Sequence, residues 1–176
     1  MSIALSTLGV AVGFAFSAKP TSTQTLEDVR PKGTGTTYTL IKDIKDVPDF
    51  NPAPDTIEVT PLINEEYKTY IHGLKDLGGD LAFLANFTQE LFDLYNNATT
   101  GIIDQAKSKL MWLQIDHPVL AKSLFVNVSP APLGLNAMSV NSAMEVTLHF
   151  APLSEPVWDS HVAFANDPRK SQQSAS

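Results

Sequence analysis

Large apolar residues occupy every second position in several segments of this chain, and this spacing limits the fold more than any other feature. In residues 8–16, small residues separate Leu8, Val10, Val12, Phe14 and Phe16. The same alternation runs through residues 143–151. Because successive side chains of a strand point to opposite faces, a period of two predicts strands.

Residues 51–87 contain two further strand candidates on either side of a polar connector. The first covers residues 57–62 and the second residues 81–87, which follow Gly78 and Gly79. Glycine tolerates positive φ, so the pair predicts a turn into the second strand. That strand is apolar on both faces, and we expect it to have neighbours on both sides.

The other strands are predicted from β-forming residues and from the breakers between them. We expect strands at residues 3–16, 36–41, 110–115, 124–128 and 143–151, and a short segment beginning at Val157. Residues 17–35 are rich in Ser, Thr, Pro, Lys and Gly, which predicts a long loop. Prolines make residues 43–55 an irregular connection.

One main helix is predicted over residues 88–98. Asn86 or Thr88 can cap its first turn, and an apolar stripe at helical spacing follows, made of Leu91, Phe92, Leu94, Tyr95 and Ala98. Residues 102–109 are expected to add one or two helical turns. Without a repeating strand–helix–strand order, the pattern predicts an antiparallel β-sandwich or barrel with one flanking helix. We expect one domain, residues 1–165, and a frayed polar tail, residues 166–176.

The chain is acidic and its surface is poor in charge. Hydrophobic residues make up 43% and charged residues only 18%, with a net charge of −7. This balance lacks the basic footprint of ordinary nucleic-acid binding, and the charge deficit favours a surface partly buried against other subunits. Residues 43–66 carry one basic and seven acidic groups. Such a block is usually a solvated face, and a functional anionic surface is the alternative.

No residue pattern in the sequence points to catalysis, a cofactor or a metal. There is no cysteine, which fits synthesis in a reducing cytosol. The histidines, at positions 72, 117, 149 and 161, lack metal-site spacing, and no nucleophile elbow or phosphate loop occurs. Asp43, Asp46, Asp49 and Asn51 lack the spacing and glycine of a calcium loop. We therefore predict no catalytic, cofactor-binding or metal residue, and a protein that is not an enzyme.

The apolar N-terminal segment has a secretory signal as its alternative interpretation. No Lys or Arg precedes residues 8–16, and the run is too short to span a bilayer. The strand interpretation is therefore favoured, and no membrane association is expected. Three sequence matches to the glycosylation pattern, at Asn86, Asn97 and Asn127, are attributed to chance in the absence of a signal.

Several segments together resemble the major tail proteins that form the tail tube of long, non-contractile-tailed bacteriophages. The similar segments are residues 44–62, 67–71, 73–79, 81–87, 130–135, 138–142 and 145–147. The resemblance implies a β-sandwich that forms hexameric rings, which stack into a hollow tube with a continuous inner barrel. It also implies a virion protein, made in the host bacterial cytoplasm.

The resemblance implies partners as well. Double-stranded DNA and the tape-measure protein would pass through the lumen, and tail terminator and distal tail or baseplate proteins would bind the ends. A long loop would reach the adjacent ring, and we assign that contact to residues 17–35, which we expect to be mobile until rings stack. We expect some of the acids in residues 43–66 to face the lumen, where they would repel DNA phosphates. Residues 51–87 would pack against both their own core and a neighbouring subunit.

Two other functions stay open at this level. One is a β-sandwich module that binds a receptor or carbohydrate at a phage tail tip or cell surface. Exposed aromatic clusters would favour it, but Trp112 and Trp158 lie in or beside apolar strands, where a core position is expected. The other is a hydrolase whose acid pair sequence spacing does not reveal.

Overall fold

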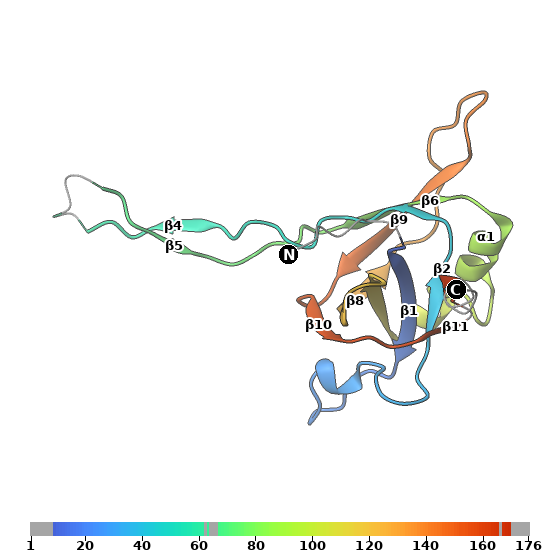
Figure 1. Cartoon of the computed structure of the whole chain (residues 1–176), viewed down its shortest axis with the longest axis horizontal. Coiled ribbons are helices and arrows are strands. Elements are labelled where there is room, and N and C mark those ends of the chain that lie inside the picture. Colours follow the sequence, from blue (N-terminus) through green and yellow to red (C-terminus); the bar gives the residue numbers. More distant parts are fainter. Residues whose placement is uncertain (1–8, 62, 64–66, 166, 170–176) are drawn as a thin grey trace.

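The computed structural model describes residues 9–61, 63, 67–165 and 167–169, which form a curled, mainly antiparallel sheet with one main helix (Figure 1). The strands of this sheet are β1 (Ala11–Ser17), β2 (Tyr38–Ile41), β3 (Ile44–Asp46), β6 (Leu81–Asn86), β7 (Leu110–Asp116), β8 (Lys122–Pro130), β9 (Glu145–Pro152), β10 (Val157–Ser160) and β11 (Phe164–Ala165). Their order is β11-β2-β1-β7-β8-β9-β6-β3, with β10 paired to β8. The prediction of a mainly β, antiparallel fold with a flanking helix is confirmed.

The sheet curls because its two ends are joined by a very short connection. β2 ends at Ile41 and β3 begins at Ile44, yet these strands lie near opposite ends of the strand order. Asp43 takes a φ of 61° in the turn between them, and its carbonyl accepts a hydrogen bond from Asn86 N at 3.1 Å. Two residues span only a few ångströms, so the ends of the sheet must come together, and we refer to this curled sheet as the barrel.

Two hydrophobic clusters lie on opposite faces of the central strands. The inner cluster fills the curl and includes Val12, Phe83, Leu113, Val126 and Phe150. The outer cluster contains Ala11, Tyr38, Trp112, Phe125, Val162 and Phe164. β1 alternates between them, as its period of two predicts, with Val12 and Phe14 inside and Ala11 outside.

The helical elements follow the sequence prediction closely. α1 covers Gln89–Asn96, and the Thr88 side chain caps it by accepting a hydrogen bond from Leu91 N. Leu91 and Tyr95 point into the inner cluster, as the apolar stripe requires. α2 (Ile102–Ala106) adds the predicted further turn, and a short 3₁₀ helix, η1 (Glu27–Val29), interrupts the loop at residues 17–35.

The prediction for residues 51–87 is correct for its second strand and correct only in part for its first, which is shorter than expected and does not join the main sheet. β6 lies between β9 and β3, so both of its edges are paired, as expected. No edge is left for residues 57–62. The strand in this region is β4 (Thr56–Glu58), which pairs with β5 (Tyr70–His72) in a separate two-stranded ribbon whose six residues are exposed. The connector therefore contains a strand and does not pack on its own core.

The N-terminal, loop and tail predictions are modified in part. The described strand begins at Ala11, after Gly9 at a φ of 82°, and residues 3–8 lie outside the described chain. The loop at residues 17–35 is fixed to the sheet through the buried side chain of Arg30. Residues 167–169 make specific contacts through Arg169 and are not frayed, while residues 170–176 lie outside the described chain.

Candidate functional site

A long two-stranded arm, made of the described residues 51–61, 63 and 67–79, projects from the barrel between β3 and β6 (Figure 1). In its register Ile57 lies opposite Ile71, and Glu58 lies opposite Tyr70. Paired residues share a face, so one face is apolar and carries Ile57, Val59 and Ile71. The other face is polar and carries an ion pair of 2.9 Å between Lys68 and Glu58.

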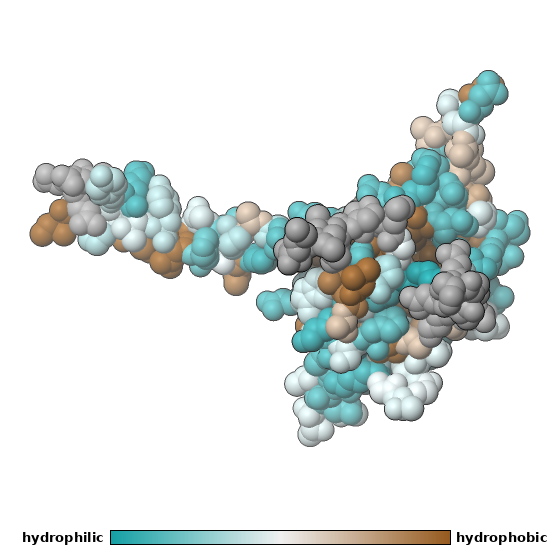
Figure 2. All heavy atoms as spheres, in the orientation of Figure 1, coloured by the Kyte–Doolittle hydropathy of each residue, from teal (hydrophilic) through white to brown (hydrophobic). Residues whose placement is uncertain are grey.

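The apolar face of the arm is open to solvent. Ile57 and Ile71 keep 52% and 51% of their surface exposed, and apolar side chains follow the lower edge of the arm in Figure 2. An isolated two-stranded ribbon is marginally stable in water at best. The arm therefore presents an apolar face that the described part of the chain leaves uncovered.

A second hairpin loop, residues 131–144, projects from the barrel between β8 and β9 (Figure 1). It contains no charged residue, and its exposed apolar side chains are Leu135, Met138, Val140 and Met144. Asn136 ties its first half to β9, because its amide donates to Thr147 Oγ1 at 3.0 Å and its carbonyl accepts from Thr147 N at 3.2 Å. The loop is thus held at its root while its tip exposes apolar groups.

Two grooves lie beside these hairpins. The first, the α1 groove, has a volume of about 600 Å³ and is lined by Phe87, Gln89, Phe92, Leu133, Gly134, Leu135 and Met144. The second, the Trp158 groove, has a volume of about 1030 Å³ at the root of the arm. Its lining combines the apolar Phe50, Leu74 and Trp158 with the charged Lys75, Asp76 and Glu155.

The two tryptophans differ in their surroundings. Trp112 is buried in the outer cluster, and its indole N–H donates to Ser17 Oγ at 3.2 Å, so its predicted core position is confirmed. Trp158 keeps 56% of its surface exposed, and its predicted core position is wrong. The reason is that β10 lies against the edge of β8 and leaves the Trp158 side chain in the open groove.

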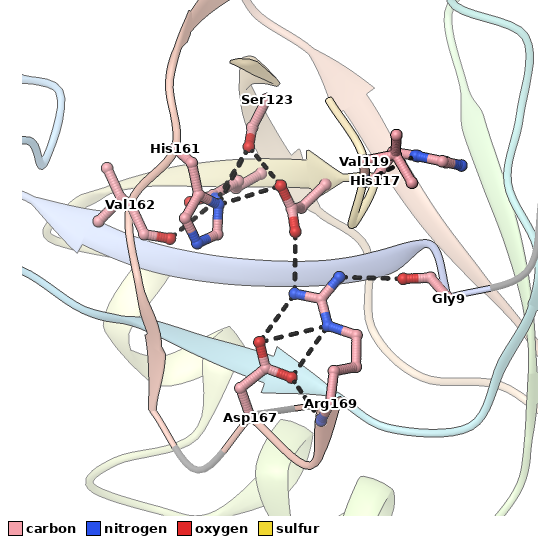
Figure 3. Close-up of polar contacts among 10 residues, drawn as sticks. Gly9, His117, Val119, Ser123, His161, Val162, Asp167 and Arg169 are labelled. Atoms are coloured by element: carbon pink, nitrogen blue, oxygen red, sulfur yellow. Dashed lines mark hydrogen bonds and ion pairs between the residues drawn. The ribbon is translucent and has the colours of Figure 1, made fainter. Parts of the chain in front are cut away.

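A buried polar cluster joins the C-terminal segment to β7 and β8 (Figure 3). The Asp116 carboxylate accepts from Ser123 Oγ at 2.7 Å and lies 3.0 Å from His161 Nδ1 and 2.8 Å from the Arg169 guanidinium. Arg169 also donates to the Gly9 carbonyl at 2.9 Å and pairs with Asp167. The hydrogen bond from Arg169 to Asp167, followed by that to Asp116, raises the pKa of the guanidinium despite its partial burial.

A serine, a histidine and an aspartate in one cluster raise the question of nucleophilic catalysis. Here the Ser123 hydroxyl donates to the Asp116 carboxylate at 2.7 Å and also lies 3.3 Å from His161 Nδ1, while both Ser123 and Asp116 are buried. A catalytic serine instead donates to the imidazole and faces an accessible site for the substrate carbonyl. The arrangement in this structure fits a clasp that fixes the C-terminal segment, with Gln114 donating to the Val162 carbonyl at 2.9 Å.

Arg30 anchors the loop at residues 17–35 in a comparable way. Its guanidinium stacks over the Phe125 ring at 4.3 Å and pairs with Glu27 and Asp159. These two carboxylates raise the pKa of Arg30 against the opposing effect of burial. The Ser160 N–H, which donates to Asp159 at 2.7 Å, and the Arg30 guanidinium lower the pKa of Asp159.

The residues that the sequence singled out do not converge on one chemical site. His72 lies on the arm, His149 pairs with Asp80 and His161 joins the clasp. Of the acidic block, Asp55 and Glu58 lie on the arm. Within the described ranges, no group of three or more His, Cys, Asp or Glu residues is placed to hold a metal ion. Asn127 is buried and donates to the Met111 carbonyl at 2.9 Å.

The clasp was missed by the sequence analysis because its members are distant in sequence. One local signal was present, since Gln114 and Asp116 share the strand face of Trp112 in β7. Polar residues on a face that also buries a tryptophan indicate a buried polar network.

A scan against protein-family models and a search of curated proteins both find no match to this chain. Across the described ranges, no helix is long and apolar enough to cross a membrane.

Proposed function

We propose that this protein is a structural subunit that assembles into stacked hexameric rings and forms the tail tube of a phage. The observation that carries this proposal is the arm, whose apolar face has no cover within the described chain. A subunit that must contact several copies of itself needs such a surface.

The positions of the tail-protein-like segments support the proposal. Residues 44–62, 67–71 and 73–79 include most of the described residues of the arm and its root, and residues 130–135 and 138–142 lie at the end of β8 and in the uncharged hairpin loop. The resemblance therefore concerns the two elements that leave the barrel, in addition to strands of the sheet. DNA and a tape-measure protein in the lumen, terminator and distal tail proteins at the ends, and location in the virion belong to the same proposal.

Two finer assignments remain predictions within this proposal. The first is that some acids of residues 43–66 face the lumen and repel DNA phosphates. The second is that the loop at residues 17–35 contacts the adjacent ring. Because Arg30 ties that loop to Phe125 and Asp159, its deletion would disturb the barrel. Substitution at its exposed positions, such as Lys19 or Gln24, is the appropriate test.

The proposal is tested by removing the arm from the chain while keeping the rest of the fold. Asp55 and Gly73 are joined across the ribbon, where Gly73 N donates to the Asp55 carbonyl at 2.6 Å. An Asn-Gly turn in place of residues 56–72 would close the ribbon at that pair. We expect this variant to keep its thermal unfolding transition and to sediment as a monomer, while the full chain sediments as large assemblies. A full chain that stays monomeric at every concentration would contradict the proposal.

The exposed Trp158 favours a second candidate, a module that binds a carbohydrate or receptor. An open aromatic side chain beside polar groups is suited to stack on a sugar ring. Glycan binding by a monomeric chain, abolished by Trp158→Ala, would support that function over assembly.

A further inference from the structure

We propose that the apolar face of the arm docks into the α1 groove of a second copy of this chain. This inference rests on the proposed assembly and names the surface that receives the arm. The contact would pair Ile57, Val59 and Ile71 of one copy with the groove around Phe92 and Leu135 of the next.

The groove of the same chain is out of reach of its own arm. The arm returns to the barrel just before Leu81, at the start of β6, and the α1 groove begins at Phe87, after β6 ends. The six residues of β6 separate the two points by about 20 Å. The arm also points away from α1 (Figure 1). The arm that occupies this groove would therefore come from another molecule, and a second copy of the chain provides such an apolar ribbon.

The distribution of charge selects the α1 groove over the Trp158 groove. None of the seven residues that line the α1 groove carries a charge, and Ile57, Val59 and Ile71 on the arm carry none. Docking there leaves the Lys68–Glu58 pair on the opposite face, in water. Docking in the Trp158 groove would cover Lys75, Asp76 and Glu155, and desolvating charged groups is costly.

The geometry of this contact allows it to repeat. The donor surface and the receiving surface are different parts of the chain, so a docked pair still offers one free arm, on one copy, and one free groove, on the other. Such a heterologous contact continues to a closed ring or a stack of rings. An arm-to-arm contact between two copies would instead stop at a dimer.

Disulfide trapping between two single-cysteine chains tests the contact directly, because the natural chain contains no cysteine. One chain carries Ile71→Cys and the other carries Leu135→Cys. The two are mixed in equal amounts, allowed to assemble and oxidised with copper phenanthroline. We expect a cross-linked product of twice the chain mass that forms at least tenfold more than in two matched controls.

The matched controls change one surface at a time. Tyr70→Cys lies on the polar face beside Ile71 and is equally exposed, at 52% against 51%. Leu153→Cys lies in the Trp158 groove and is also half-exposed. The first control pair, Tyr70→Cys with Leu135→Cys, therefore detects contact through the polar face of the arm. The second, Ile71→Cys with Leu153→Cys, detects docking in the Trp158 groove.

Electron microscopy of each mixture before oxidation distinguishes a failure of the docking inference from a failure of the proposed function. Assemblies with a strong Ile71–Leu135 cross-link support the inference. Assemblies without that cross-link, or with an equal yield in either control, overturn the inference while the proposed function stands. Absence of assembly in the natural chain under the same conditions contradicts the proposed function and the inference together.

Discussion

The ring of Phe164 lies directly over Gly13, where any side chain would stand. A methyl group on Gly13 would approach Cε1 of Phe164 to 2.3 Å and the Thr39 carbonyl oxygen to 2.9 Å. The glycine thus lets the C-terminal segment close over β1 and complete the outer cluster with Tyr38 and Trp112. Arg169, whose guanidinium lies 5.4 Å from the Phe164 ring centre, secures the same segment.

Gly13→Ala is expected to destabilise the fold by about 1–3 kcal/mol, because Phe164 must leave its position or the backbone must shift. The free energy of unfolding in urea measures the effect. Gly134→Ala is the matched control, since a methyl group there meets no atom within 4 Å. Equal stability of the two variants would show that Phe164 does not pack on β1 as described.

Arg169→Met removes the guanidinium and is expected to lower the free energy of unfolding by about 2 kcal/mol. The Asp116 carboxylate would stay buried with one cationic partner removed, and the partial exposure of Arg169 keeps the cost below that of a fully buried pair. A double-mutant cycle with Asp116→Asn measures the coupling between the two residues. We expect the double variant to lose less stability than the two single variants lose together. Strict additivity of the two losses in free energy would argue against the clasp.

Tyr95→Phe is expected to leave stability at neutral pH unchanged or to raise it by up to about 1 kcal/mol. Among the described residues the buried Tyr95 hydroxyl has no hydrogen-bond partner, so its removal breaks no hydrogen bond and leaves no other group unpaired. Tyr38→Phe is the contrasting variant and should lose about 1 kcal/mol, because the Tyr38 hydroxyl donates to the Pro31 carbonyl at 3.2 Å.

The same tyrosines predict a loss of stability in alkali. Burial raises the pKa of both phenols above the ordinary value of 10.0. The folded state then retains protons that the unfolded chain releases, so stability is fully present below that value and falls as the pH rises above it. Urea unfolding across this range should show a shallower decline for Tyr95→Phe. An identical decline in both proteins would contradict the burial of the Tyr95 phenol.

Asp159→Asn is expected to destabilise the protein at neutral pH and to have little effect in acid. The pKa of Asp159 is lowered in the fold by the Ser160 N–H and by Arg30. Its contribution is therefore present above the ordinary value of 3.8 and is lost as the pH falls through the lower, folded pKa. Unfolding of both proteins at several pH values checks this; a difference that persists in strong acid would exclude the carboxylate as its source.

Much of the barrel follows from local patterns. The alternation in residues 8–16 and 143–151 places Val12, Phe14, Val146 and Phe150 on the inner face, as predicted. Thr88 caps α1 because its side chain precedes an apolar stripe at helical spacing. These features depend on neighbours in sequence, which is why the sequence reveals them.

The arm and the clasp depend instead on which edges and partners are free in the complete fold. The sequence predicts a strand of the main sheet at residues 57–62, but β6 is already paired on both edges, and Thr56–Glu58 pair with β5 instead. Asp116, His161 and Arg169 meet only after the C-terminal segment crosses β1. The exposure of Trp158 could not be predicted for the same reason. Apolar neighbours in the sequence do not determine which face of an edge strand is covered in the fold.

Electron microscopy of the purified full chain tests the central claim, self-assembly through the projecting elements, most directly. The account predicts hollow tubes or six-fold rings that disappear when residues 56–72 are replaced by an Asn-Gly turn. Single particles of monomer size in both preparations, at concentrations where each chain is folded, would contradict it.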